Sequence, residues 1–169
     1  MVKKSVVDVN LEELREAGYD AIIFDLDNTL VGWRAKTVPQ DVTRWLERAG
    51  DLGFKMCIVS NSLVRRVTKF SELLGIPAIP KAIKPMQRPF LRALHILNAH
   101  PQKVVVIGDQ VFTDVLGGNR LGSFTILVRP VDKREFFTTI LFRTAEKLVL
   151  FRLRKKGMLK DFFTKKEKC

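Results

Sequence analysis

The feature that most constrains the fold of this chain is an alternation of short apolar runs with amphipathic stretches over residues 1–128. The apolar runs are rich in β-branched residues and lie at 20–26, 55–60, 103–108 and 123–128, with a weaker fifth at 77–79. They are apolar on both faces, as buried parallel strands require. Residues with helical periodicity lie between them, at 38–51, 64–74 and 86–97. The pattern predicts βαβ units, and therefore an α/β fold with a central parallel sheet flanked by helices.

The length of 169 residues corresponds to one domain, and a hydrophobic content of 46% is sufficient for a buried core. The longest apolar stretches, such as 104–107, are far shorter than the ~20 residues of a membrane-spanning helix, so we expect none. The N-terminus lacks the apolar segment of a secretory signal. Cys57 and Cys169 form neither a disulfide framework nor a metal-ligand spacing. These features favour a location in the cytoplasm.

The charge of the chain is concentrated in its C-terminal part. The formal net charge is +12, and residues 129–169 carry 13 basic and 5 acidic groups. Residues 133–163 interleave Phe and Leu with Arg and Lys, which is a basic amphipathic pattern. For 133–145 a surface helix packed on the core is an equally good interpretation, whereas 148–168 favours a role at an anionic phospholipid membrane surface. We therefore predict an N-terminal segment at 1–19, a core at 20–130 and a basic amphipathic helical tail at 131–169.

Two carboxylates stand where the first apolar run ends. Asp25 and Asp27 are separated by one residue, and ligands of open parallel sheets bind outside the carboxyl ends of the strands. Like charges so close together are costly in a low dielectric unless a cation holds them. The pair therefore indicates a divalent metal. The plainer alternative is a capping or turn pair, because Asp is common at strand-to-loop junctions.

Later strand ends carry further polar side chains, in the order Ser60 and Asn61, then Lys84, then Asp109 and Asp114. Each is ambiguous alone. Ser and Asn before a helix are most often N-caps, although free helix N–H groups there can also face an anion. A lone lysine is usually solvated. The last two carboxylates follow Gly108, and glycine allows the backbone to approach a ligand closely.

The joint order of these motifs resembles the haloacid dehalogenase (HAD) superfamily of phosphotransferases. The motifs are Asp-Leu-Asp-Asn-Thr-Leu at 25–30, Ser-Asn-Ser at 60–62, Lys-Pro at 84–85 and Gly-Asp-Gln-Val-Phe-Thr-Asp at 108–114. The form of the first two, with residues 113–120, is similar to the subclass IIIA phosphatases of the YqeG type. This resemblance covers roughly residues 20–130 and implies a Rossmann-like HAD core. That narrower family is similar to phosphatidylglycerophosphate phosphatases, which implies a lipid phosphate monoester as one candidate substrate.

The resemblance also implies a role for each motif residue. Asp25 is the expected nucleophile, which forms an aspartyl-phosphate, and Asp27 the expected general acid and base. Mg²⁺ is the expected cofactor, held by Asp25, the Asp27 backbone carbonyl and Asp109, with Asp114 as a further ligand or an orienting group. Expected phosphate-binding residues are Ser60, Asn61 and Lys84. We expect Lys81, His95 and His100 to have no part in the chemistry. The alternative for Lys81 is that it shares the role of Lys84.

No cap domain is expected, because residues 31–54 and 63–83 each have room for little more than one helix. An uncapped site admits large substrates, so we predict a Mg²⁺-dependent phosphatase of a large or surface-exposed phosphate monoester, with phosphatidylglycerophosphate as the best guess. Such an enzyme is expected in the cytoplasm or peripheral on the inner face of the membrane. The alternative is a nucleic-acid-associated protein that uses the HAD core as a scaffold or acts on polynucleotide phosphate ends. A third interpretation makes the tail a helix for self-association.

Overall fold

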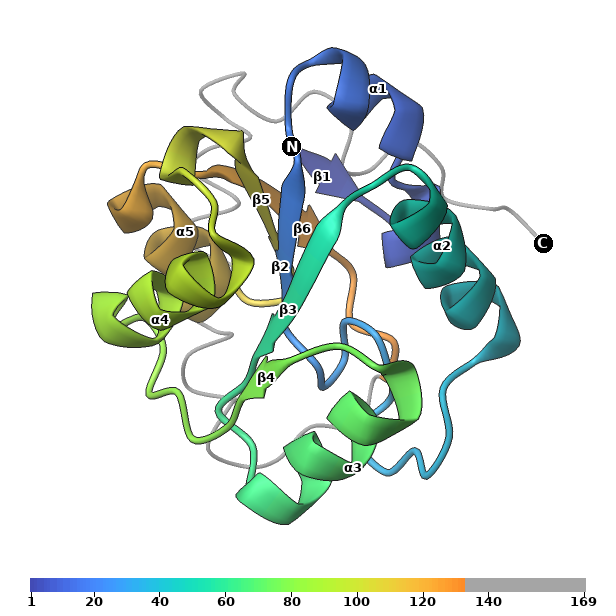
Figure 1. The fold of residues 1–169 in the computed structure, drawn as a ribbon. Coiled ribbons are helices and arrows are strands. Elements are labelled where there is room, and N and C mark those ends of the chain that lie inside the picture. The colour runs from blue at the N-terminus through green and yellow to red at the C-terminus, as the bar shows by residue number, and fades with distance from the viewer. Residues whose placement is uncertain (133–169) are drawn as a thin grey trace, which may run out of the picture.

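The structure is a computed structural model that describes residues 1–132, and the predictions for the tail fall outside the described residues. The described chain forms a six-stranded parallel sheet in the order β1-β6-β5-β2-β3-β4 (Figure 1). Its strands are β1 (Val2–Lys3), β2 (Ala21–Phe24), β3 (Lys55–Val59), β4 (Ala78–Ile79), β5 (Val104–Gly108) and β6 (Phe124–Val128). The predicted α/β fold with a central parallel sheet is confirmed, and β2 to β6 match the five predicted runs.

The middle of the sheet is buried on both faces. All residues of β2 and β5 are buried, and the two strands pair from Ala21–Val104 to Phe24–Ile107. The pairing continues beyond the strand, because the backbone N–H of Asp25 donates to the carbonyl of Ile107 at 2.9 Å. The start of the first motif is therefore fixed to the neighbouring strand by a backbone hydrogen bond.

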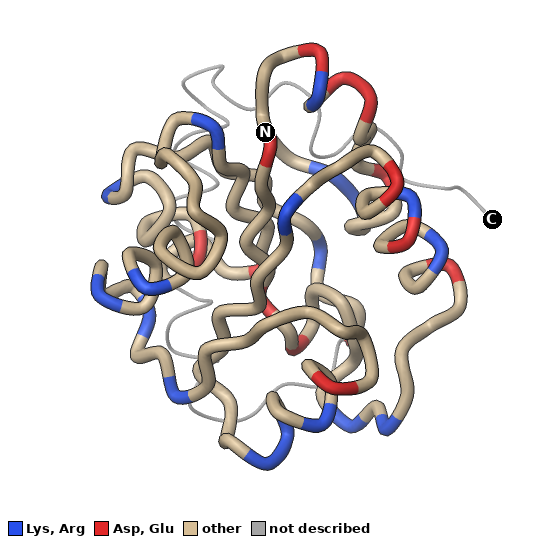
Figure 2. Tube along the Cα trace, in the orientation of Figure 1, with Lys and Arg blue, Asp and Glu red and all other residues tan. Residues whose placement is uncertain are grey.

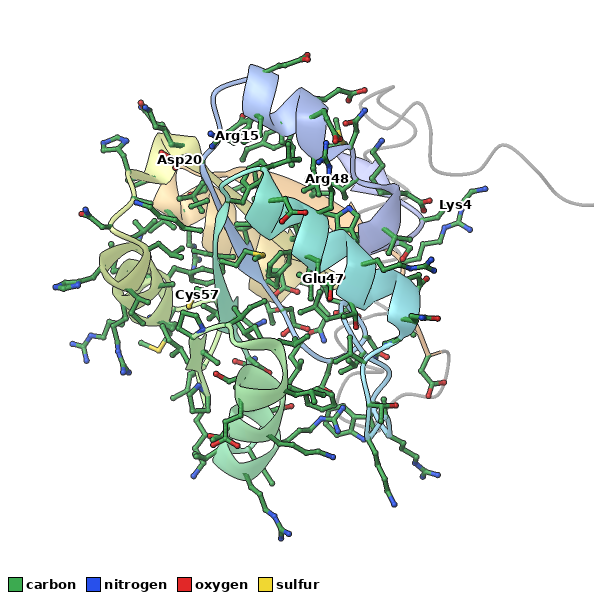
Figure 3. All side chains as sticks on the ribbon, turned by 45° about the vertical axis from the view of Figure 1, so that its right-hand side comes forward. Lys4, Arg15, Asp20, Glu47, Arg48 and Cys57 are labelled. Carbon is green, nitrogen blue, oxygen red and sulfur yellow. The ribbon has the colours of Figure 1, made fainter. Side chains whose placement is uncertain are left out.

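Helices cover both faces of the sheet (Figure 1). One face packs against α1 (Leu11–Glu16), α2 (Gln40–Asp51) and α3 (Val64–Leu74), and the other against α4 (Gln87–Leu97) and α5 (Leu116–Leu121). Alternate residues of β2 divide between the two cores, with Ile22 and Phe24 facing α2 and Ile23 facing α4. Cys57 of β3 is buried on the α4 side, where burial raises the pKa of its thiol to about 12 (Figure 3).

Helix α3 has the predicted bounds, α4 begins one residue later than predicted, and α2 begins two residues later than predicted. Their apolar residues recur every three to four positions, which places Val42, Trp45 and Leu46 of α2 in the core. Helix α3 ends at Gly75, whose φ of 66° is left-handed and suits glycine. The sequence analysis assigned no element to the segments that form α5 and the π-helical turn η3 (Val111–Val115).

The first 19 residues contribute to the core as well. Strand β1 pairs with β6 at the edge of the sheet, and the 3-10 turn η1 (Val6–Asp8) leads towards α1. The Trp45 indole N–H donates to the Val9 carbonyl at 3.0 Å, and Arg48 of α2 reaches α1, where it pairs with Glu12 at 2.8 Å (Figure 3). This N-terminal segment is thus tied to α2 by both buried and exposed contacts.

Within residues 1–132, no cap domain follows either of the first two motifs. The chain passes from the first motif through a loop at 32–39 into α2, and residues 60–63 lead directly into α3. The described helices are also too short or too polar to cross a membrane. The edge of the sheet at which β2, β3, β4 and β5 end is therefore covered by no inserted domain in this part of the chain.

Candidate active site

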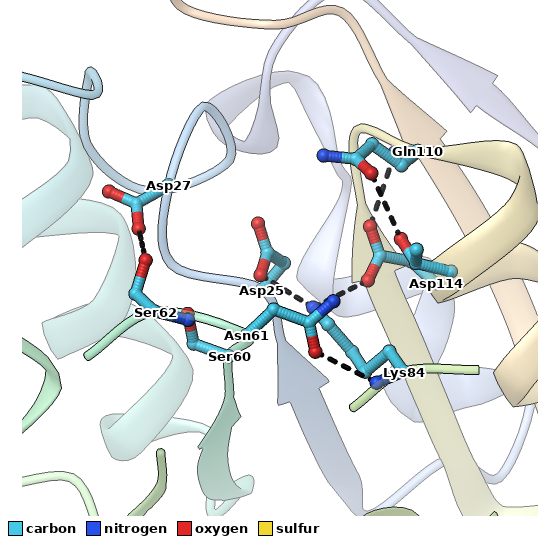
Figure 4. Close-up of polar contacts among 9 residues, drawn as sticks. Asp25, Asp27, Ser60, Asn61, Ser62, Lys84, Gln110 and Asp114 are labelled. Atoms are coloured by element: carbon cyan, nitrogen blue, oxygen red, sulfur yellow. Dashed lines mark hydrogen bonds and ion pairs between the residues drawn. The ribbon is translucent and has the colours of Figure 1, made fainter. Parts of the chain in front are cut away.

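The carboxyl ends of four strands bring the predicted motifs together (Figure 4). Asp25 follows β2, Ser60 follows β3, Lys84 lies five residues after β4, and Asp109 follows β5 directly. All four side chains are buried, as is Asp114. Buried polar groups at one sheet edge in this number are typical of a ligand site in an open α/β fold.

The centre of the site is an ion-pair cluster around Lys84. Its Nζ atom lies 2.5 Å from Asp25 Oδ1 and 2.7 Å from Asp114 Oδ1. Burial lowers the pKa of Lys84, but the carboxylates of Asp114 and Asp25 outweigh burial, and the net direction is upward. Lys84 is therefore a permanent cation at the bottom of the site.

Burial has the larger effect on Asp25. It raises the pKa of this carboxyl to about 7, against the opposing attraction of Lys84 and with a further increase from the negative charge of Asp114. A carboxyl with this pKa exchanges its proton near neutral pH. Perturbed carboxyls of this kind are typical of reactive positions.

Three carboxylates meet beside the lysine. Ligand oxygens of Asp25, Asp109 and Asp114 all lie within 4.8 Å of one another, and all three residues are buried. One ammonium group cannot balance three carboxylates, so a divalent cation would compensate the remaining negative charge. A set of hard oxygen donors fits Mg²⁺, which accepts carboxylates together with water and substrate phosphate. These three residues would hold the ion.

Asp27 lies apart from this cluster in its contacts. Its Oδ2 accepts a hydrogen bond from the Ser62 hydroxyl, and its Oδ1 accepts one from Arg66 Nε at 2.7 Å. The Arg66 guanidinium also donates to the carbonyls of Gly32 and Ala35, each at 3.0 Å. Both carboxylate oxygens of Asp27 are thus engaged by α3 and the residues before it, rather than by Lys84.

Sequence reasoning did not assign a role to Ser62 or Arg66. Ser62 is part of the second motif, and Arg66 follows it by four residues. Positions four apart lie on the same side of a helix, so this spacing was the available signal that the two side chains act together. Such a spacing does not reveal that Arg66 reaches across to a different strand end. Only the fold brings α3 against the loop at 32–39.

The phosphate-binding candidates of the second motif have structural contacts. Ser60 Oγ accepts the backbone N–H of Ser62 at 3.1 Å, and Asn61 Oδ1 accepts the backbone N–H of Lys84 at 2.8 Å. Asn61 therefore fixes the lysine loop to the end of β3. Lys81 is exposed and lies outside the charge cluster, and His95 and His100 are exposed on the far side of α4 and before η2 (Pro101–Lys103).

Gly108 makes the position of Asp114 possible. A Cβ atom at residue 108 would lie 2.2 Å from Asp114 Cγ, which is far inside contact distance. Asp114 sits in the turn η3, and its Oδ2 accepts the backbone N–H of Gln110 at 3.1 Å. The missing side chain at 108 is what lets Asp114 fold back over β5 towards Lys84.

Comparisons with known proteins agree with this geometry. A family model described as HAD-hydrolase-like matches residues 82–131, which include Lys84, Asp109 and Asp114. A solved HAD phosphatase from Thermococcus onnurineus superposes with a TM-score of 0.52 at 26% identity, over 60% of this chain and 51% of that one. The fold and the site thus define a HAD-type phosphomonoester hydrolase without a cap in its described part.

The chain is 46% identical over 154 residues to the probable phosphatase YqeG of Bacillus subtilis (strain 168), which covers 91% of this chain and 90% of that protein. It therefore belongs to the YqeG family. It is also 25% identical to the phosphatidylglycerophosphate phosphatase 1, chloroplastic/mitochondrial, of Arabidopsis thaliana, over 89% of this chain and 46% of that protein. The chain spans about half the length of that plant relative.

Proposed function

We propose that this phosphatase is Mg²⁺-dependent, that it works through an aspartyl-phosphate on Asp25, and that its substrate is a lipid phosphate monoester, phosphatidylglycerophosphate in the first instance. The observation that carries the proposal is the buried cluster of Asp25, Asp109 and Asp114 around Lys84. This cluster combines a nucleophile, a cation and a set of metal ligands within one site.

Asp25 attacks the phosphorus through a carboxylate oxygen, and the alcohol leaves with a proton from Asp27. In the second half of the reaction Asp27 removes a proton from water, and the water oxygen attacks the phosphoryl group on Asp25. The bond between phosphorus and the Asp25 oxygen breaks, which releases inorganic phosphate and restores the carboxylate. Ser62 and Arg66 each donate a hydrogen bond to one oxygen of Asp27 and so fix the position of its carboxyl group. The bound Mg²⁺ supplies positive charge to the phosphoryl oxygens.

Lys84 is the residue whose positive charge compensates the negative charge of the substrate phosphate. In the structure it is paired with Asp25 and Asp114, and a bound phosphoryl group offers its Nζ a third anionic partner. A fixed cation in a buried site stabilises negative charge on the phosphoryl oxygens far more than an exposed one does. Ser60 and the Asn61 amide are proposed to bind the remaining phosphoryl oxygens.

Two observations support a large substrate. No cap covers the site within residues 1–132, and the plant relative is a phosphatidylglycerophosphate phosphatase by name. A phosphate that projects from a bilayer can enter an uncapped site without the rest of the lipid following it. Polynucleotide phosphate ends are the alternative, supported by the net charge of +12.

The test is a substrate comparison with the purified full chain. We expect Mg²⁺-dependent release of phosphate from phosphatidylglycerophosphate in mixed micelles, and less from a 5′-phosphorylated oligonucleotide. Acid-quenched enzyme should carry label from phosphorus-labelled substrate, and hydroxylamine should remove it, as expected for an acyl phosphate. Asp25→Asn should carry no label. Turnover of the oligonucleotide but not of the lipid would reject the substrate, and a label retained in Asp25→Asn would reject the nucleophile.

A further inference from the structure

Six exposed apolar side chains lie at the end of the sheet that holds the site. They are on the segments that follow β2, β3, β4 and β6, and they are Trp33, Leu63, Val64, Ile83, Met86 and Val131. Leu63 and Ile83 are the most exposed, at 69% and 68% of their full surface. We call these six residues the apolar rim. Single exposed apolar residues are common, but six at one end of the sheet indicate an interaction surface.

Hydrogen bonds join the loops of the apolar rim into one surface. The backbone N–H of Lys81 donates to the Ser62 carbonyl at 3.1 Å, which holds the loop before Ile83 against the start of α3. Arg66 connects α3 to the Trp33 loop through the Gly32 carbonyl. The backbone N–H of Val131 donates to the Asn28 carbonyl at 3.0 Å. The rim therefore belongs to the same body as the site.

Basic residues are interleaved with the rim. The exposed basic side chains of these loops and first helical turns are Arg34, Lys36, Arg65, Lys81, Arg88 and Arg129, against the acidic Asp41 and Asp132. Figure 2 shows acidic residues gathered instead at the opposite end, on α1 and the second half of α2. The acidic residues there are Glu12, Glu13, Glu16, Glu47 and Asp51. The entrance thus combines apolar and basic groups, while the opposite end carries most of the exposed negative charge.

We propose that the apolar rim docks on an anionic lipid bilayer, with the site entrance facing the headgroups. The proposal rests on the lipid phosphate proposed above as substrate and names the surface that delivers it. Large aliphatic side chains enter the headgroup boundary, and basic neighbours contact anionic lipid, which is how interfacial surfaces bind. Asp25 is only 7% exposed, so a headgroup reaches it only when the entrance lies against the bilayer.

Nucleic acid fits this surface less well. Binding to single strands uses aromatic platforms for base stacking and basic residues for phosphates. The rim has one aromatic residue, Trp33, and its other members are aliphatic or Met. Its composition therefore favours a lipid interface. The alternative occupants of the apolar rim are a second copy of this chain and residues 133–169 of the same chain. The experiment below distinguishes each of them from a bilayer.

The experiment measures vesicle binding of the full chain by co-sedimentation, without Mg²⁺ and without substrate. Vesicles of phosphatidylcholine and phosphatidylglycerol in equal amounts are compared with vesicles of phosphatidylcholine alone. We expect Leu63→Ser combined with Ile83→Ser to weaken binding to the mixed vesicles by about tenfold or more, because two inserted aliphatic groups are lost. Leu73→Ser combined with Ile96→Ser is the matched control, since Leu73 and Ile96 are exposed at the far ends of α3 and α4.

Charge is tested in the same assay. Arg65→Gln with Arg88→Gln should reduce the preference for mixed over neutral vesicles. Lys55→Gln with Lys103→Gln should not, because these two exposed lysines lie at the amino ends of β3 and β5, away from the rim. Unchanged binding of the Leu63/Ile83 variant, or equal weakening in its control, would overturn the proposal, and would mean that residues 133–169 or another surface bind the vesicle. A change of oligomeric state in the Leu63/Ile83 variant, seen by light scattering, would identify a second copy as the occupant and overturn it too.

Activity separates this proposal from the proposed function. The Leu63/Ile83 variant and its Leu73/Ile96 control should both hydrolyse p-nitrophenyl phosphate as the wild type does. Only the Leu63/Ile83 variant should lose activity on phosphatidylglycerophosphate in vesicles. If vesicle binding depends on the rim but the wild type does not hydrolyse the lipid, the proposed substrate is rejected and the proposed docking surface is supported. If the Leu63/Ile83 variant hydrolyses the lipid as fast as the wild type, the proposed docking surface is rejected and the proposed substrate is supported.

Discussion

Asp25 is held in surroundings that work against its charge, and this is the central fact at the scale of single residues. Burial raises its pKa to about 7, and Asp114 adds to the rise, while Lys84 opposes it. The proposed nucleophile therefore depends on cations to remain ionised. A reactive carboxylate with few hydrogen bonds of its own is less stabilised in the free enzyme than a solvated one, which leaves more of its reactivity for the attack on phosphorus.

Replacement of Asp25 should separate activity from stability. Asp25→Asn should lower turnover at least about 10³-fold, because the nucleophile is lost. The metal-free variant should be more stable than the wild type at about pH 8, by about 1 kcal/mol or more, because Asn carries no charge for burial to oppose; the pKa of about 7 already includes the attraction of Lys84. Lys84 keeps Asp114 as its partner. Urea denaturation and a p-nitrophenyl phosphate assay measure both, and a variant less stable than the wild type would contradict the account of Asp25.

Arg66 should matter through Asp27, the residue it holds. Arg66→Ala should reduce kcat/KM on an alkyl phosphate about 10²-fold, which is the usual contribution of a positioned acid, with little change on p-nitrophenyl phosphate. The reason is that kcat/KM reports the steps up to departure of the leaving group. An alcohol needs the proton of Asp27 to leave, whereas p-nitrophenolate leaves without one. Arg92→Ala, an exposed arginine of α4, is the control. Equal losses on both esters would mean that Arg66 supports the fold rather than leaving-group protonation.

At the scale of elements, glycine decides how closely β5, η3 and α5 approach. Besides Gly108, a Cβ atom at Gly117 would lie 2.3 Å from the Phe90 ring of α4, and one at Gly118 would lie 2.6 Å from Thr125 of β6. Because these two positions carry no side chain, α5 can lie directly against α4 and the sheet. The position of Asp114, the proposed metal ligand, therefore depends on the packing of a short helix that follows it.

Gly108→Ala should disturb the site without removing any ligand. Its Cβ atom collides with Asp114, so we expect a loss of about 1–3 kcal/mol in stability together with weaker Mg²⁺ binding. Gly50→Ala is the matched control, because a Cβ atom in α2 meets only Met56 Cε at 3.9 Å and should raise stability by about 0.5 kcal/mol. Urea denaturation and calorimetric Mg²⁺ titration measure the two effects. Normal Mg²⁺ affinity in Gly108→Ala would show that Asp114 is not a ligand.

At the scale of the molecule, sequence reasoning succeeded where burial leaves a continuous pattern. Buried parallel strands are apolar on both faces, so the runs that became β2, β3, β5 and β6 were visible, and the motifs at their ends followed. It failed where elements are too short for periodicity, as in β1 and α1. It also missed the contact of Arg66 with Asp27, because a pair 39 residues apart is set by packing and not by spacing.

The structure as a whole should show the cost of the site as a dependence of stability on pH and Mg²⁺. The folded-state pKa of Asp25 is raised to about 7 from 3.8, so its contribution to stability is complete below the unfolded value and is lost as the pH rises through about 7. Relative to Asp25→Asn, the metal-free wild type should therefore lose stability progressively between about pH 4 and pH 7, with little further change above about pH 8. Comparing the two proteins cancels the other titrating groups.

Mg²⁺ should reverse this loss, because binding requires the ionised carboxylates and releases the proton. At a Mg²⁺ concentration 100 times the dissociation constant measured at about pH 8, the wild type should gain about 2.7 kcal/mol, or several degrees in Tm, at that pH. The same concentration should give a smaller gain at about pH 6. Thermal unfolding followed by circular dichroism, with Mg²⁺ or with a chelator, measures the gain. Asp109→Ala should show a smaller gain that grows with Mg²⁺ concentration. A wild-type gain that is equal at both pH values would mean that Mg²⁺ does not displace the proton of Asp25.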